Sequence, residues 1–196
     1  RCDFRREYWE SYQAVNRKFA DAIDEAVDDD EMLWVHDYHL MLVPNHLDAS
    51  PLDRAIGFFL HIPFPGVDTF TKLPWRDEVL EGLLGYELVG LQARRDLRNF
   101  VQCVEELTDA EIDRQDRRAV IDHDGRTVRA EVFPIGCNYD EFAERADAAE
   151  QTQALSDLHD GIGDYQILLG VDRLDYTKGL IQRFKGLERA LEKYPS

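Results

Sequence analysis

The sequence has few cysteines and no long apolar run. Its three cysteines, Cys2, Cys103 and Cys137, are widely spaced and form no Cys-x-x-Cys pair, so neither a disulfide framework nor a zinc knuckle is expected. No apolar stretch approaches the roughly 20 residues of a membrane span, and the N-terminal residues lack the apolar core of a signal peptide. We therefore expect a protein of the reducing cytoplasm with no membrane partner.

Lysine is also scarce. The chain has 5 Lys beside 18 Arg, 24 Asp and 16 Glu, which gives a net charge of −17. A charge of this size and sign repels nucleic acids and anionic lipids, so we expect neither as a partner. A surface rich in carboxylates and poor in lysine is typical of salt-adapted proteins, in which high salt screens the repulsion. The alternative is an ordinary acidic cytosolic protein, and full stability in dilute buffer would favour it.

The apolar content is sufficient for a packed core. Hydrophobic residues make up 44% of the 196 residues and aromatic residues 11%. The length suits one large domain, or one domain and part of another. The composition becomes rich in Ala, Glu, Asp and Gln after residue 140, and we expect a domain boundary between residues 137 and 160.

Apolar strands alternate with helical patterns along the chain. Short apolar runs predict strands at residues 32–35, 55–60, 88–92 and 165–171, and a hairpin at 120–133 around Asp124-Gly125. A 3.6-residue period predicts helices at residues 77–84, 94–107 and 180–194. It also predicts an N-terminal helix whose buried face carries Tyr8, Tyr12, Val15, Phe19 and Ala26, with Trp9 and Ile23 beside it. This alternation predicts an α/β fold with a parallel, doubly wound sheet.

Polar residues follow the predicted strands where each strand ends. They are His36 and Asp37, then His61, then Gln92, then Asp172 and Arg173. In doubly wound sheets, ligands bind beyond the carboxyl ends of the strands. We therefore expect several of these side chains to converge on one edge of the sheet.

The first motif is His36-Asp37-Tyr38-His39. A metal site is one interpretation, but neighbouring residues of an extended chain point in opposite directions, so His36 and Asp37 do not readily share one ion. Asp37 could instead accept hydrogen bonds from sugar hydroxyls. A helix N-cap at Asp37 explains the residue equally well.

The second motif places His61 after an apolar strand, in His61-Ile62-Pro63-Phe64-Pro65. The prolines fix an extended, stiff loop, which suits an imidazole that orients a reacting centre. The alternative is a structural or solvent-exposed histidine.

The third motif is the segment Gly170 to Gly179, in which Arg173 and Lys178 precede a glycine and a helix. Two cations beside the positive end of a helix form a receptor for a diphosphate, although the P-loop pattern is absent. The alternative is a surface loop in which Arg173 pairs with Asp172 or Asp175.

Together these segments resemble the trehalose-6-phosphate synthases, the retaining GT-B glycosyltransferases of family 20. The resemblance is collinear over essentially the whole chain and rests on the following strings: WxxYxxVNxxFA (9–20), WVHDYHL (34–40), IGFFLHIPFP (56–65), ELVGLQ (87–92), VFPIG (132–136) and GVDRLDYTKGL (170–180). Departures from the family pattern at Leu91, Ala93, Cys137 and Asn138 affect loop details only.

The resemblance implies transfer of glucose from a nucleotide-glucose, usually UDP-glucose, to glucose 6-phosphate, which gives α,α-trehalose 6-phosphate. Asp37 matches the family residue that contacts the acceptor. His61 and Ile62 match residues at the donor glucose and its anomeric centre. Arg173 and Lys178 match the cations on the donor diphosphate. His61, Arg173 and Lys178 would be the catalytic residues, and the family needs neither a metal nor another cofactor.

The resemblance covers only the middle of the family. It implies that residues 1–145 are the C-terminal part of the N-terminal, acceptor-side Rossmann-like domain. Residues 146–196 would then begin the nucleotide-sugar-binding domain. Because the active site of a GT-B enzyme lies between two domains, we expect the isolated chain to be inactive.

Three alternatives to this function remain, two of them within the same family. One is glucosylglycerol-phosphate synthase of the same family, and the other is a non-catalytic, regulatory member of the family. A metal-dependent hydrolase built on residues 36–39 is a third, from another class. The sequence leaves a homo-oligomeric state open. A role in osmoprotection would agree with a salt-adapted surface.

Overall fold

The computed structural model describes residues 3–28, 31–47, 55–149, 152–163, 165 and 167–194. The chain divides into two units, Arg1–Cys137 and Asn138–Ser196. This division falls within the region in which the composition changes. The boundary expected from the family resemblance, after residue 145, lies eight residues further along, inside helix α5 (Tyr139–Ala149).

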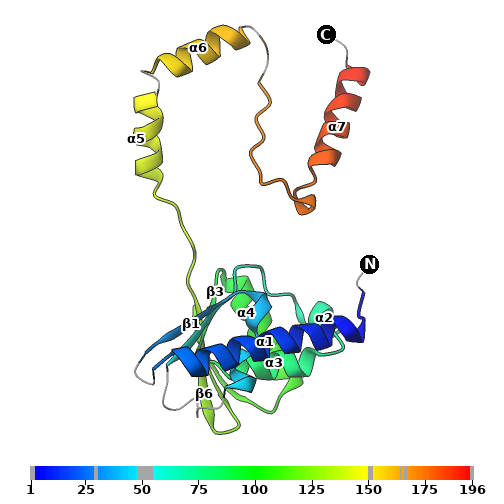
Figure 1. Ribbon diagram of the computed structural model, residues 1–196, viewed down its shortest axis with the longest axis vertical. Helices are drawn as coiled ribbons and strands as arrows, with labels where there is room; N and C mark the ends of the chain where they lie inside the picture. Colours follow the sequence, from blue (N-terminus) through cyan, green and yellow to red (C-terminus); the bar gives the residue numbers. More distant parts are fainter. Residues whose placement is uncertain are drawn as a thin grey trace. The chain divides into compact units, whose positions relative to one another are not determined.

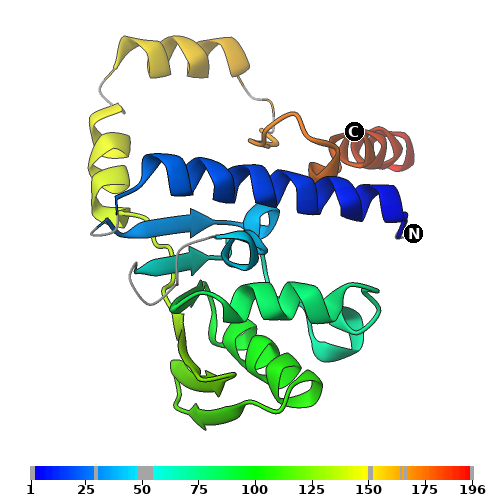
Figure 2. The same cartoon turned by 60° about the horizontal axis from the view of Figure 1, so that its bottom comes forward.

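The first unit is built on one six-stranded sheet, with the order β1-β2-β3-β6-β5-β4. The strands are β1 (Leu33–His36), β2 (Ile56–Phe59), β3 (Leu88–Leu91), β4 (Glu111–Arg114), β5 (Arg118–His123) and β6 (Arg126–Val132). The neighbours β1, β2, β3 and β6 pair in parallel, whereas β4 and β5 extend the sheet in antiparallel fashion. The predicted α/β class with a mainly parallel sheet is therefore confirmed (Figures 1 and 2).

The predicted strands of the first unit match the observed ones to within a residue or two at each end. Phe58, Val89, Leu91, Ile121 and Val128 are fully buried in these strands. The hairpin turns at Asp124 and Gly125, whose φ angles of 48° and 76° are both positive, as a two-residue hairpin turn requires. Strand β4 was not predicted, because its sequence, Glu-Ile-Asp-Arg, has only one apolar residue.

Helices and short 3-10 turns complete the unit. They are α1 (Arg6–Ala26), α2 (Val67–Phe70), α3 (Arg76–Leu84), α4 (Arg94–Leu107), η1 (Tyr38–Leu40) and η2 (Val43–His46). Helix α4 has the predicted bounds, and it buries Leu97, Phe100, Val101, Cys103 and Val104 against the sheet. The regular spacing of these side chains explains why the sequence pattern located this helix so well.

The predicted apolar face of α1 is only partly correct, because Trp9 and Tyr12 pack against the core but other members do not. Tyr8, Val15 and Phe19 are about half exposed, whereas Asn16 and Ala20 are fully buried. The side chain of Asn16 faces inward because its amide donates to the carbonyl of His39 and accepts from the N–H of Leu42. A hydrophobic pattern places asparagine outside, so it rotates the expected face by about one residue.

The second unit contains the helices α5 (Tyr139–Ala149), α6 (Gln153–Ile162) and α7 (Leu180–Lys193) and the 3-10 turn η3 (Tyr176–Lys178) (Figure 1). The predicted helix at 180–194 is confirmed. The strand predicted at 165–171 is wrong: its described residues form no ladder, and Leu168, Leu169 and Val171 are about four-fifths exposed. A strand is defined by hydrogen bonds to a neighbour, and the described part of this unit offers none.

Among the described residues, no helix is both long enough and apolar enough to cross a bilayer.

Candidate active site

The carboxyl ends of β1 and β2 lie side by side. His36 is in register with Phe59, and the N–H of Asp37 donates to the carbonyl of Phe59 at 2.8 Å, so the pairing continues past both strands. The backbone N–H of His61 then approaches Oδ1 of Asp37 at 3.4 Å. The predicted convergence of polar residues is therefore observed for the first unit.

Asp37 has an unusual backbone conformation. Its φ of 70° and ψ of 166° lie in a region that residues with a Cβ rarely adopt. Its Oδ1 also accepts from the N–H of Tyr38 at 3.0 Å and caps the turn η1. The capping interpretation is thus correct for this oxygen. Oδ2 has no hydrogen bond within the described residues, so the carboxylate keeps one oxygen available for a ligand.

Buried groups hold the turn that follows Asp37. The Tyr12 hydroxyl donates to the carbonyl of Tyr38 at 2.7 Å, and the Tyr86 hydroxyl donates to the carbonyl of Leu40 at 2.7 Å. Asn16 binds the same turn at two further points, as described for α1. Burial raises the pKa of Tyr12 to about 12, and it also raises the pKa of Tyr86 well above its ordinary value. Both phenols are therefore neutral and act as fixed donors.

His61 is fixed through its ring and through its backbone. Its Nε2 lies 3.0 Å from Nδ1 of His36, and its ring packs against Phe59 with 4.9 Å between ring centroids. The side-chain amide of Gln92, which follows β3, donates to the carbonyl of His61 at 2.8 Å. His61 is exposed, as the alternative interpretation expected, but both its ring and its backbone are held in place.

The loop after His61 leaves Ile62 half exposed. Further along the loop, the carbonyl of Phe64 accepts from Nδ2 of Asn99 on α4 at 2.8 Å, and the ring of Phe64 packs edge-on against Phe100. The stiff Pro63-Phe64-Pro65 segment is therefore anchored to α4. Ile62 is presented at the same edge as His61.

Arg173 and Lys178 lie in the second unit, in the segment that leads into α7. Asp172 pairs with Arg183, and Asp175 accepts from both the N–H and the hydroxyl of Thr177. Arg173 therefore does not form the ion pairs with Asp172 or Asp175 that the surface-loop interpretation required. Within the described part of the chain, the side chains of Arg173 and Lys178 form no hydrogen bond or ion pair.

The carboxyl groups of Asp172 and Asp175 have pKa values below their ordinary value. The hydrogen bond from Arg183 lowers the pKa of Asp172, and the hydrogen bonds from Thr177 lower the pKa of Asp175, with smaller effects from nearby cations. Gly179 has a φ of 62° and begins α7 without a side-chain cap. The free N–H groups of this helix end add positive potential beside the two cations.

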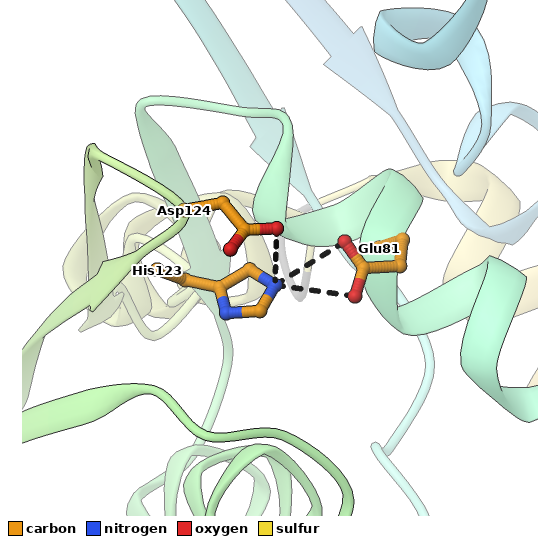
Figure 3. Close-up of side chains that lie close together, drawn as sticks. All are labelled: Glu81, His123 and Asp124. Carbon is orange, nitrogen blue, oxygen red and sulfur yellow. Dashed lines mark hydrogen bonds and ion pairs between the residues drawn. The ribbon is translucent and has the colours of Figure 1, made fainter.

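The metal interpretation of residues 36–39 gains no support. Within the described residues, Glu81, His123 and Asp124 are the side chains close enough to share an ion. Nε2 of His123 lies 3.1 Å from Glu81 and 3.7 Å from Asp124 (Figure 3). This group lies at the start of β6, the edge of the sheet opposite Asp37 and His61. Here the hydrogen bonds join α3 to the hairpin.

The geometry of the first unit is that of a ligand site at the carboxyl edge of a parallel sheet, and the sequence profile of glycosyltransferase family 20 matches residues 1–196. The chain belongs to glycosyltransferase family 20. Its curated relatives include the trehalose-6-phosphate synthases of Mycobacterium sp. (strain KMS), 40% identical over 195 residues, and of Escherichia coli (strain K12 / DH10B), 39% identical over 194 residues. These matches cover 96% and 98% of this chain but 40% of each relative, so the chain spans about two-fifths of their length.

Solved structures agree with this family membership. An α,α-trehalose-phosphate synthase (UDP-forming) from Burkholderia xenovorans, in complex with glucose 6-phosphate, has a TM-score of 0.82 and 36% identity. The match covers 98% of this chain and 43% of that one. An E. coli structure bound with UDP-2-fluoro glucose has a TM-score of 0.79 and 38% identity, and covers 98% and 42% of the two chains. The predicted GT-B type of fold is thereby confirmed.

The residues that hold the turn after Asp37 in place were not predicted from the sequence. Asn16 and Tyr86 lie in apolar surroundings, and no local pattern marks them as partners of the turn after Asp37. His36 was considered as a metal ligand, whereas the structure makes it the neighbour of His61. The sequence did contain a signal for this pair. The predicted strands end near His36 and Phe59, and His61 follows Phe59 by two residues, so parallel pairing would bring the two histidines together.

Proposed function

We propose that the protein containing this chain is a retaining glucosyltransferase. It transfers glucose from a nucleotide-glucose, with UDP-glucose the expected donor, to glucose 6-phosphate, and its product is α,α-trehalose 6-phosphate. The observation that carries this proposal is the fixed pair of Asp37 and His61 at the carboxyl edge of the sheet, in a family 20 chain. The choice of substrates is based on two relatives of the same family. One was solved with glucose 6-phosphate and the other with UDP-2-fluoro glucose.

Each site residue has a role that its surroundings can support. The free oxygen of Asp37 accepts from hydroxyls of the acceptor sugar. His61 and Ile62 lie at the donor glucose, where the packed imidazole orients the anomeric centre. Arg173 and Lys178 bind the donor diphosphate, since their side chains are not neutralised by Asp172 or Asp175.

The cations act most strongly as the glycosidic bond breaks. In front-face transfer, the leaving diphosphate accepts the proton of the incoming hydroxyl while negative charge grows on its oxygens. Arg173 and Lys178 stabilise this developing charge, so they lower the barrier and do more than bind the donor. No step requires a metal, because the two cations balance the charge of the diphosphate.

The function is tested by a transfer assay on a full-length protein that contains this chain, run in molar salt without metal. The donors are UDP-, ADP- and GDP-glucose, and the acceptors are glucose 6-phosphate and glycerol 3-phosphate. Label in trehalose 6-phosphate supports the proposal and names the donor. Label in glucosylglycerol phosphate assigns the protein to the alternative synthase. Absence of transfer with every pair indicates a regulatory member of the family. The 196-residue chain assayed alone is expected to be inactive.

The cation pair gives a quantitative prediction. Arg173→Ala in the full-length protein is expected to lower kcat by roughly 10²–10³-fold, as loss of a transition-state donor does. Arg189→Ala serves as the matched control, because it removes the same charge from the C-terminal half of α7. It should leave kcat within about twofold. Wild-type turnover in the Arg173 variant would remove this residue from the proposed mechanism.

The cellular setting follows from the same proposal. A trehalose-forming enzyme with a charge of −17 suits a cytoplasm with high salt, where its product serves in osmoprotection. Nucleic acids and membranes are not expected partners, and the protein assembles, if at all, as a homo-oligomer.

A further inference from the structure

A cleft lies between the first turns of α4 and the turn that joins β4 to β5. Its volume is about 370 Å³, which falls within the range of roughly 300–1,000 Å³ that small-molecule sites occupy. Four arginines line it, Arg94 and Arg98 from α4 and Arg114 and Arg118 from the two strands. We call it the arginine cleft. Leu97 and Val101, both nearly fully buried, are also among its lining residues.

The arginine cleft carries a local excess of positive charge. Arg94 pairs with Asp116 at 3.0 Å, Arg114 pairs with Glu105, and Arg118 donates to the neutral side chain of Gln115. Four cations and two carboxylates leave 4 − 2 = +2, in a chain whose net charge is −17. Such a patch is exceptional on a surface that is otherwise acidic.

Arg98 is the residue that most favours a ligand. Its side chain has no hydrogen bond or ion pair within the described residues, although it lines the cleft. The ion pairs of Arg94 and Arg114 are solvent-exposed, since these side chains are 60% and 44% exposed, and exposed pairs are held weakly. An anion with several oxygens can therefore recruit all four guanidinium groups at little cost.

The start of α4 reinforces this charge. The N-cap residue, Ala93, offers no side-chain hydrogen bond, so the first N–H groups of the helix are not capped by a side chain. The helix has 14 residues, and its positive end carries Arg94 and lies next to the cleft. Guanidinium groups bind phosphate oxygens in a bidentate, planar geometry, and in the described part of the chain only Arg94 and Arg114 of the four arginines pair with a carboxylate.

The arginine cleft is separate from the proposed glucosyl-transfer site. Arg118 begins β5 opposite Glu131 of β6, so the cleft lies at the same carboxyl edge as His61. The strand order places β5 three strands from β2, which is roughly 14 Å along the sheet at the usual strand spacing. Asn99, the α4 residue that anchors the loop after His61, follows the cleft-lining Arg98 directly in the sequence.

From these observations we propose that the arginine cleft binds a phosphorylated small molecule, through a phosphate or diphosphate group, as an effector site distinct from the donor and acceptor sites. The nucleotide phosphates and the sugar phosphates share the chemistry that the four arginines recognise. Occupancy would hold the first turns of α4 against the β4–β5 turn, and through Asn99 it would tighten the loop that carries His61. Phosphate binding at the cleft does not depend on the proposed function, whereas its role as an effector site rests on it.

The test is a titration of the 196-residue chain with inorganic pyrophosphate, followed by calorimetry and by the NMR signals of the arginine side chains. It is run at a salt concentration at which circular dichroism shows the chain folded. Wild type is expected to bind one equivalent at the arginine cleft, with the largest shifts of the cleft residues at Arg94, Arg98 and Arg118. Arg98→Gln, which removes a charge but breaks no hydrogen bond, should weaken binding about tenfold.

Two variants distinguish binding at the arginine cleft from binding elsewhere on the chain. Arg95→Gln removes the same charge from the same helix turn but outside the cleft, and it should change affinity less than twofold. Arg173→Gln removes a cation of the proposed donor site and should leave pyrophosphate binding at the cleft intact. Binding lost in Arg173→Gln and kept in Arg98→Gln would overturn the proposal, as would equal weakening by Arg95→Gln and Arg98→Gln. Absence of binding to wild type would overturn it as well.

The source of the phosphate is then identified by parallel titrations with UDP, glucose 6-phosphate and glucose, with the Arg98→Gln variant as reference. Binding of UDP that Arg98→Gln weakens indicates a nucleotide effector, and the same result with glucose 6-phosphate indicates a sugar phosphate. Glucose lacks phosphate and should not shift the arginine signals, and a shift with glucose would overturn the phosphate assignment.

Discussion

At the scale of single residues, Asp37 is held in a conformation that its own backbone opposes. The positive φ places its carboxylate between the N–H of Tyr38 and the N–H of His61, and the hydrogen bonds of Tyr12, Asn16 and Tyr86 keep the next turn in place. Strain of this kind persists only where surrounding contacts determine the backbone, and it gathers at functional sites. The strain at Asp37 is thus an independent structural reason to regard it as functional.

The strain can be measured by comparing two substitutions. Asp37→Ala and Asp37→Gly both lose the capping carboxylate, but only alanine keeps the cost of a Cβ at positive φ. We expect the alanine variant to be less stable than the glycine variant by roughly 1–2 kcal/mol, measured by urea unfolding of the chain. Alanine and glycine variants of equal stability would show that the position is unstrained.

The two buried phenols predict a loss of stability at high pH. Burial raises the pKa of Tyr12 from 10.0 to about 12 and also raises that of Tyr86. A raised pKa in the folded state means that stability is complete below pH 10 and falls as the pH rises through 10 to about 12, because the unfolded chain loses its protons first. The free energy of unfolding, measured between pH 8 and 12, should therefore decline. Tyr12→Phe and Tyr86→Phe, which cannot ionise, should each flatten this decline, and an unchanged slope in both would contradict the assignment.

At the scale of helices and strands, the sequence located those elements whose stability is local or strongly periodic. Helix α4 was predicted with its observed bounds, since five of its buried side chains recur at helical spacing. The hairpin was predicted from Asp124-Gly125, whose turn geometry depends on those two residues. Strand β4 escaped prediction because it joins the sheet through backbone hydrogen bonds to β5 rather than through apolar side chains.

Two further differences between prediction and structure also arise from contacts with distant parts of the chain. The segment at 165–171 has a strand's composition but no pairing partner among the described residues, and composition cannot supply one. The buried face of α1 depends on Asn16, whose tertiary partners His39 and Leu42 lie more than 20 residues away in the chain. Within the candidate site, the strand ends revealed Asp37 and His61. The groups that hold them could not be predicted, because they are brought together only by tertiary contacts.

The hairpin turn gives a prediction at this scale. Gly125 has a φ of 76° and Gly136 has no positive φ, and a Cβ added at either position would meet open space. Gly125→Ala should therefore destabilise the chain by about 1–2 kcal/mol through backbone strain alone. Gly136→Ala, the matched control, should be neutral or slightly stabilising. Thermal unfolding of both variants separates strain from crowding, and equal effects would argue against a strained turn.

At the scale of the whole molecule, charge is the dominant property. The 40 acidic residues, only partly neutralised by 23 basic residues, repel one another strongly when salt is low. The arginine cleft and the cations before α7 are local exceptions, and both face anions in the roles proposed for them. If these proposals hold, the same charge distribution would disfavour nonspecific binding of nucleic acids and still allow small phosphates to bind.

The overall charge predicts that salt stabilises the fold. Raising potassium chloride from 0.1 M to 1 M shortens the Debye length from about 10 Å to about 3 Å, which screens most repulsion between surface carboxylates. The melting temperature of the chain should rise across this range, whereas that of a neutral protein of similar size should change little. A melting temperature that is constant or falls with salt would favour an ordinary acidic protein.

The contact between the rings of His36 and His61 affects which hydrogen bond His61 can form at the proposed site. Nδ1 of His36 and Nε2 of His61 are joined by a single hydrogen, so one ring supplies it and the other receives it. If His36 supplies it, neutral His61 carries its own hydrogen on Nδ1 and offers a donor to the ligand. If His61 supplies it, Nδ1 becomes an acceptor. His36 therefore sets whether Nδ1 of His61 is a donor or an acceptor, so a change at His36 is expected to alter how the proposed site recognises a hydroxyl group.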